Sequence, residues 1–149
     1  MNEASNILKE NKVVHSVNIM SAHRSPDDVT RFAKTARSKG VKIIIAGAGG
    51  AAHLAGVIAS HTTLPVIGVP MDTKDLKGID SLFSTVQMPS GIPVATVAIG
   101  KTGAKNAAIL AMEILALNDK SLERSLLAFK AKLVKDVRKK DARCGCPKL

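Results

Sequence analysis

Hydrophobic and polar positions repeat with two different periods along the first forty residues. Residues 4–8 carry apolar side chains at helical spacing, whereas residues 13–20 (Val-Val-His-Ser-Val-Asn-Ile-Met) alternate as in a β-strand. A polar loop at 21–25 follows, and a proline and two aspartates then open a helical stretch at 26–39 that stops at Gly40. The pattern therefore predicts a helix, a strand and a second helix.

Two short β-branched runs without alternation come next. Residues 42–46 (Lys-Ile-Ile-Ile-Ala) and 64–70 (Leu-Pro-Val-Ile-Gly-Val-Pro) have the composition of strands that are buried on both faces of a sheet. A glycine-rich turn at 47–50 and a helical stretch at 51–61 separate them. This order of strand, helix and strand is typical of parallel β-α-β units.

The second half of the chain continues the same alternation. It predicts a loop and short helix at 72–86, a strand at 94–99, a helix of small residues at 103–117 and a last helix at 121–140. Strands that alternate with helices indicate an α/β fold with an open, mostly parallel sheet covered by helices on both faces. We expect one domain at residues 1–141, followed by a flexible basic tail at 142–149.

Composition excludes several classes of function. Of 149 residues, 46% are hydrophobic and 2% aromatic, so the chain can form a core but has few rings on which nucleobases could stack. The net charge is +10, from 22 Lys+Arg and 12 Asp+Glu, and most of the excess lies after residue 120, away from the candidate site. For these reasons we expect no nucleic-acid partner. We also expect no membrane partner, because no apolar run approaches the length of a membrane-spanning helix.

The cysteines give no sign of a metal site or a structural disulfide. Cys144 and Cys146 lie together at the C-terminus, where they cannot link parts of the core, and no set of residues has the spacing of a zinc framework. The N-terminal residues also lack the apolar stretch of a signal peptide. We therefore expect a cytoplasmic protein without metal or cofactor.

The loop after the first predicted strand carries candidate chemistry, because ligands of parallel sheets bind at the carboxyl ends of strands. In this loop His23 offers an imidazole that can donate and accept protons near neutral pH, and Arg24 offers a planar cation suited to phosphate. Ser25 is a favourable N-cap for the following helix. A purely structural hydrogen-bonding role for His23 remains open at this point.

The glycine-rich turn is the second candidate. Glycines at 47–50 let backbone N–H groups approach a ligand, and a helix start behind them would favour an anion. With Ala52 the turn also fits the relaxed dinucleotide pattern Gly-x-Gly-x-x-Ala, although Asp72 is a poor match for the acidic partner of that pattern. An NAD(P)-dependent oxidoreductase is therefore an alternative. His53, in the first turn of the helix, is expected to be structural or packed against the site.

Five motifs in order and in register resemble one enzyme family. They lie at residues 21–26 (Ser-Ala-His-Arg-Ser-Pro), 46–54 (Ala-Gly-Ala-Gly-Gly-Ala-Ala-His-Leu), 68–70 (Gly-Val-Pro), 78–82 (Gly-Ile-Asp-Ser-Leu) and 87–96 (Gln-Met-Pro-Ser-Gly-Ile-Pro-Val-Ala-Thr). Over about residues 3–130 the chain closely resembles the N5-carboxyaminoimidazole ribonucleotide mutases, the PurE family of purine biosynthesis.

The resemblance implies a flavodoxin-like three-layer sandwich that assembles into a homo-octamer. It also implies a reaction on a small ribonucleotide, in which a carboxylate moves from the exocyclic nitrogen to ring carbon 4 by decarboxylation and recarboxylation, with CO2 held as a bound intermediate. In the family, the histidine of the Ser-Ala-His-Arg loop shuttles the proton. That residue here is His23.

The same resemblance assigns binding roles to both loops. Arg24 would bind the substrate phosphate, and Ser21 and Ala22 would shape the loop. The remaining residues would surround the imidazole ring and hold CO2: Ala46, Gly47, Ala48, Gly49, Gly50, His53 and Leu54. Relatives that take up free CO2 directly carry Lys at the position of Arg24 and lack the Gly-Gly-Ala-Ala-His run, so the chain resembles the mutase class.

One family feature has no counterpart in the sequence. Family members normally begin with a hydrophobic strand that ends in Gly-Ser-x-Ser-Asp, whose Ser and Asp contact the phosphate and ribose. Either the start is misplaced or truncated, or the protein has lost a central strand. For these 149 residues alone, the sheet exposes backbone groups, and we expect a weakened fold and reduced or absent activity. A non-catalytic oligomeric remnant of the family is therefore a further alternative.

Overall fold

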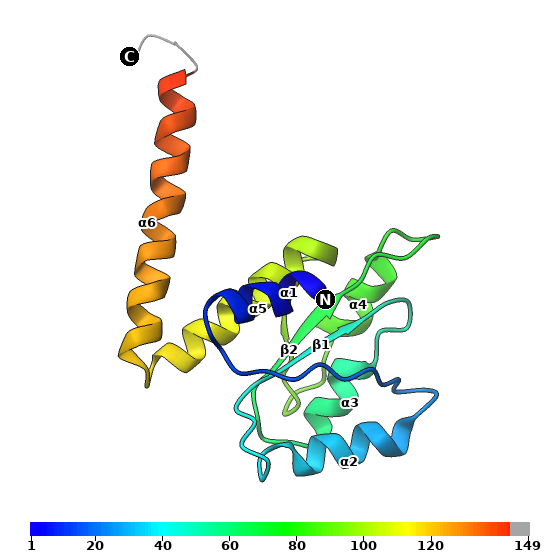
Figure 1. Ribbon diagram of the computed structural model, residues 1–149. Coiled ribbons are helices and arrows are strands. Elements are labelled where there is room, and N and C mark those ends of the chain that lie inside the picture. Colours follow the sequence, from blue (N-terminus) through cyan, green and yellow to red (C-terminus); the bar gives the residue numbers. More distant parts are fainter. Residues whose placement is uncertain (144–149) are drawn as a thin grey trace. The chain divides into compact units, whose positions relative to one another are not determined.

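The computed structural model describes residues 1–143 and divides the chain into two compact units, Met1–Ala111 and the part from Met112 onward. Helices and strands alternate in the middle of the chain, with two successive helices before and after this part (Figure 1). The elements in order are α1 (Asn2–Glu10), α2 (Pro26–Ala36), β1 (Ile44–Ala48), α3 (Leu54–Ser60), β2 (Val66–Pro70), α4 (Ile79–Val86), β3 (Ala95–Thr96), α5 (Gly100–Ala116) and α6 (Lys120–Arg143).

The three strands form one parallel sheet in the order β1-β2-β3. Ile44 pairs with Val66 at one end of the β1-β2 ladder and Ala48 with Pro70 at the other. All five residues of the middle strand β2 are buried. Gly68 in this strand has α4 against it, since a Cβ there would lie 2.5 Å from Cγ2 of Thr85. The predicted parallel α/β architecture is confirmed.

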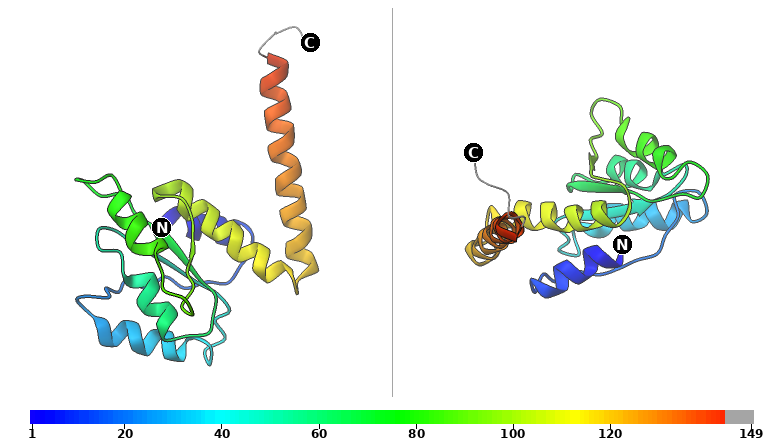
Figure 2. Two further views of the ribbon diagram at one scale, coloured as in Figure 1. Left: turned by 180° about the vertical axis from the view of Figure 1, so that it is seen from behind. Right: turned by 90° about the horizontal axis from the view of Figure 1, so that it is seen from above.

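Helices cover both faces of the sheet in the first unit. Figure 2 shows α3 and α4 on one side, and α1 with the beginning of α5 on the other. Lys105 of α5 forms an ion pair with Glu3 of α1, with 3.3 Å between Nζ and Oε2. This arrangement of helix, sheet and helix layers is the flavodoxin-like sandwich expected from the sequence.

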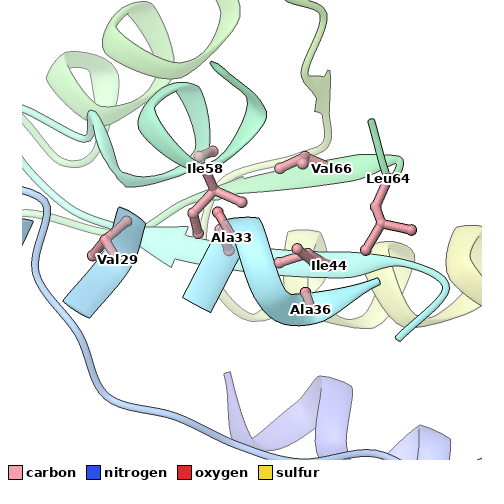
Figure 3. Packing of buried hydrophobic residues seen from close by; sticks show 9 residues of the cluster. Val29, Ala33, Ala36, Ile44, Ile58, Leu64 and Val66 are labelled. Carbon is pink, nitrogen blue, oxygen red and sulfur yellow. The ribbon is translucent and has the colours of Figure 1, made fainter. Parts of the chain in front are cut away.

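The main hydrophobic core lies between α2, α3 and the sheet (Figure 3). Its side chains are small or branched, so the two helices approach the strands closely, and their burial supplies the main stabilisation of this layer. The buried cluster consists of Val29, Ala33, Ala36, Ile44, Ala46, Ala55, Ile58, Leu64 and Val66. The core thereby fixes both the start of α2 and the end of β1, which are the two elements that border the candidate site.

The strand predicted at residues 13–20 is absent, and that prediction is wrong. The segment runs as irregular backbone, and within the described residues its positions 14–20 make no hydrogen bond to another backbone group. Val14 and Ile19 are completely exposed, and Val17 is 70% exposed. An alternating sequence forms a strand only beside a partner, and β1 pairs on one edge only, with β2.

Several element boundaries differ from the sequence prediction. β1 ends at Ala48, so Gly47 and Ala48 belong to the strand rather than to the turn, because they pair with Val69 and Pro70. α3 begins only at Leu54 and β3 has just two residues, whereas α4 lies within the loop and short helix predicted at 72–86. α6 extends to Arg143, whereas Cys144, Cys146 and the rest of the predicted tail lie outside the described residues.

The second unit contains the end of α5 and the helix α6. Leu122 and Leu126 are buried, and Lys130 forms an ion pair with Glu113 at 2.7 Å. The apolar stripe of α6 continues through Phe129, Leu133 and Val137, which are exposed. Among residues 1–143, no helix combines the length and hydropathy needed to cross a membrane.

Candidate active site

The turn that carries His23 is closed by two serines. The backbone N–H of Ser21 donates to Oγ of Ser25 (3.0 Å), the Ser25 hydroxyl donates back to the Ser21 carbonyl (3.2 Å), and the N–H of Arg24 donates to Oγ of Ser21 (3.2 Å). Ser25 is the N-cap residue of α2, as predicted, but its hydroxyl makes no capping bond to the helix. The hydroxyl instead fixes the turn that presents His23 and Arg24.

The glycine-rich turn at 47–50, called the glycine loop below, is held in place by side chains of α4. Ser81 is fully buried, and its hydroxyl accepts a hydrogen bond from the Gly50 N–H (3.0 Å) and donates one to the Met71 carbonyl (2.7 Å). Ser84 also donates to the Gly50 carbonyl (3.3 Å). The sequence motif Gly-Ile-Asp-Ser-Leu contained Ser81, but nothing local indicated that its hydroxyl would support a loop 31 residues away.

Replacing Ser81 with Ala should destabilise the protein by about 1–3 kcal/mol, because the fully buried hydroxyl is lost and the half-buried Gly50 N–H and Met71 carbonyl both lose their partner. Urea unfolding measures this change in the free energy of unfolding. Ser60→Ala is the matched control, since Ser60 is exposed on α3 and bonds only within its own helix. Equal stabilities of the two variants would show that Ser81 does not anchor the loop.

The two loops meet at an open cavity of about 440 Å³. Its lining joins the turn before α2 with the carboxyl end of β1, as expected for a parallel sheet. The lining residues are Ile19, Met20, Ser21, Ala22, His23, Arg24, Ser25, Gly47, Ala48, Gly49, Ala51 and Leu54. Most of the predicted site residues therefore come together. Ile19 and Met20 are lining residues that the sequence did not single out, Ser25 was expected only as a helix cap, and Ala51 belongs to the 46–54 motif.

Three predicted site residues do not line the cavity. Ala46 is buried inside β1, Gly50 points its N–H at Ser81, and His53 contacts the ring of His23 instead. The helix dipole expected behind the glycines is also weak, because α3 has only seven residues and begins four residues after Gly50. The glycine loop therefore gives the cavity open space and backbone groups rather than the positive end of a helix dipole.

The charged and titratable groups of the cavity are accessible. Arg24 is exposed, and its guanidinium forms no ion pair or hydrogen bond with any residue in the described part of the chain. His23 is also exposed, and its Nε2 lies 2.9 Å from Nδ1 of His53. The site therefore combines an available cation, an imidazole that can exchange protons, and an apolar or backbone surface on the remaining sides.

The acidic residue considered for the dinucleotide pattern does not line the cavity. Among residues 1–143, no three His, Cys, Asp or Glu side chains are grouped so as to hold a metal ion. Asp72, the acidic residue considered for the dinucleotide pattern, lies instead at the start of α5, where a Cβ on Gly100 would be 2.7 Å from its Oδ2. This carboxylate does not belong to the cavity.

Comparisons with known proteins point to one family. A family model described as AIR carboxylase matches residues 1–136. The N5-carboxyaminoimidazole ribonucleotide mutase of Bacillus subtilis is 56% identical over 126 residues, which cover 85% of this chain and 78% of that protein. The mutase of Saccharolobus solfataricus is 53% identical over 137 residues, covering 92% and 85%.

A solved structure shares the fold. The crystal structure of Treponema denticola PurE superposes with a TM-score of 0.87 and 26% identity, and the match covers 97% of this chain and 89% of that chain. Identity above one half to several curated relatives, together with a family match over nearly the whole chain, leaves no other family in contention. The chain belongs to the AIR carboxylase family.

Proposed function

We propose that the protein is an N5-carboxyaminoimidazole ribonucleotide mutase of purine biosynthesis. The observation that carries the proposal is that His23, Arg24 and the glycine loop line one cavity in a chain more than half identical to several mutases. Family membership favours this activity over a dinucleotide-dependent oxidoreductase and over a remnant without activity. Arg24 and the run Gly49–His53 favour the mutase class within the family.

The proposed reaction uses one proton carrier twice. The bond between the exocyclic nitrogen and the carboxylate carbon breaks, CO2 forms, and the nitrogen keeps the electron pair and takes a proton from His23. Ring carbon 4 then attacks the CO2, and the proton on that carbon returns to His23, which restores the aromatic ring. Because no proton is gained or lost overall, one imidazole suffices.

The walls of the cavity can bind the phosphate of the substrate and enclose its ring and the CO2. The unpaired guanidinium of Arg24 can bind the phosphate of the substrate, while Ser21 fixes the turn through its hydrogen bond with the Arg24 N–H and Ala22 lines the cavity beside it. Gly47, Ala48 and Gly49, with Leu54 behind them, can surround the imidazole ring and the CO2. Ala46 and Gly50 support this wall from inside the fold rather than by contact with substrate.

The test is turnover of the carboxyamino ribonucleotide by the purified chain and by Arg24→Gln. Loss of the charge-assisted contact to phosphate should raise KM about 10- to 100-fold, with a smaller effect on kcat. Arg31→Gln is the control, because Arg31 is an exposed residue of α2 that pairs with Asp28. A variant with lowered kcat and unchanged KM would contradict the role of Arg24. Absence of turnover both by the chain and by a version with an apolar strand ending in Gly-Ser-x-Ser-Asp joined before Met1 would contradict the function.

We also propose that the protein is cytoplasmic and forms a homo-octamer. The resemblance to the mutases supports both, and the surface of α4 supports assembly. Ile79, Phe83 and Val86 follow one another at helical spacing on α4, Leu76 lies in the turn just before the helix, and each of the four is between 46% and 60% exposed. A row of exposed apolar side chains of this kind is typical of a surface that another subunit covers.

A further inference from the structure

The ring of His23 has a second histidine as its partner. His23 belongs to the serine-closed turn before α2, and His53 is the N-cap residue of α3, so the two come from elements 30 residues apart. Nε2 of His23 and Nδ1 of His53 are 2.9 Å apart, and the ring centroids are 5.0 Å apart with the planes at 88°. The distance is that of a hydrogen bond between two nitrogens.

This contact restricts the protons on both rings. A hydrogen bond between two imidazole nitrogens requires one proton between them, so the two rings cannot both be imidazolium ions while the contact is intact. When His23 is charged, it carries N–H groups at both nitrogens, and its Nε2–H can only donate. His53 must then be neutral, with a lone pair on Nδ1 and its own proton on Nε2.

We propose that His53 is a positioning residue for the proton shuttle, which it provides by accepting the Nε2–H of His23 and leaving Nδ1 of His23 to exchange the proton with substrate. The inference rests on the proposed function for the identity of that substrate. His53 is well suited to this role because its backbone is fixed: its N–H donates to the Ala51 carbonyl (2.8 Å) and its carbonyl accepts from Val57 (2.9 Å).

A neutral imidazole differs from a carboxylate as the partner of a catalytic histidine. A buried carboxylate stabilises the imidazolium strongly, as in hydrolases that use the histidine as a base. A neutral acceptor orients the ring and fixes its tautomer but adds no negative charge. His23 must both give and retake a proton in one turnover, and a neutral partner leaves these two steps closer in free energy.

The direct test is nitrogen NMR of the histidine side chains in the whole protein. In neutral wild-type protein we expect both His23 and His53 to carry the proton on Nε2. In His53→Leu, His23 should become a mixture of tautomers, whereas His61→Asn, at the other end of α3, should leave His23 unchanged. A proton on Nδ1 of neutral His23 in the wild type, or an unchanged tautomer in His53→Leu, would overturn the inference.

Kinetics provide a second readout. His53→Leu should lower kcat about 100-fold with KM nearly unchanged, because a misdirected catalytic group slows chemistry rather than binding. His53→Asn should recover much of the loss, since its side-chain oxygen can accept the same hydrogen bond. A raised KM with unchanged kcat would show that His53 binds substrate instead. If the wild type itself lacked mutase activity, the NMR result would still show whether the His23 Nε2–H donates to Nδ1 of His53.

Discussion

His23→Asn should lower kcat at least about 1,000-fold while the protein stays folded, because the variant has no group that can carry the proton between the exocyclic nitrogen and carbon 4. Asparagine is the informative replacement, since its amide can still form hydrogen bonds but does not titrate. The measurement is formation of the carboxylated product under saturating substrate. Substrate affinity should change little, because Arg24 supplies the charge that binds phosphate.

Two further measurements make the His23 result decisive. The thermal midpoint of His23→Asn should stay within a few degrees of the wild type, because exposed substitutions change stability by about 0.5 kcal/mol or less. His15→Asn is the control, since His15 is also exposed and bonds to Ser5 in the segment before the site. Normal turnover by His23→Asn would exclude His23 as the shuttle and with it the proposed chemistry.

The strands that formed as predicted are those whose partners are present. The runs at 42–46 and 64–70 are apolar on both faces, and they became β1 and β2 within two residues at either end. The run at 13–20 has equally good strand character, but residues 1–143 offer it no strand with which it pairs. Strand formation depends on backbone groups supplied by another segment, and a local pattern cannot show whether that segment is there.

The residues of the site likewise fall into those that local sequence predicted and those that depend on which segments meet in the fold. The glycines were found because loops after parallel strands have a predictable place in the sheet, whereas His23 and Arg24 were found by the same argument from a strand at 13–20 that the structure lacks. The hydrogen bonds of Ser25, Ser81 and His53 depend on which segments meet after folding, and the three residues looked like a helix cap, a member of a motif and a structural histidine. Sequence patterns indicated which groups have suitable chemistry, whereas the fold determines what holds each group in position.

Joining an apolar strand that ends in Gly-Ser-x-Ser-Asp upstream of Met1 should stabilise the protein and increase its activity. The open edge of β1 can pair with such a strand, and residues 14–20 can pair with its other edge, since Ile19 and Met20 already line the cavity beside Gly47. Burial of Val14, Val17 and Ile19, with new backbone hydrogen bonds, should contribute about 3–6 kcal/mol. For a chain of this size the thermal midpoint should rise by about 10 °C.

The decisive readout for the added strand is amide hydrogen exchange at residues 14–20. These amides make no backbone hydrogen bonds in the present structure, and they should become strongly protected only if a strand pairs beside them. An extension of equal length with prolines at the apolar positions is the control, because proline cannot donate to a ladder. Turnover and the mass by light scattering should rise together, toward an active octamer. If residues 14–20 remained unprotected in the stabilised protein, the edge of β1 would not be the place where the strand binds.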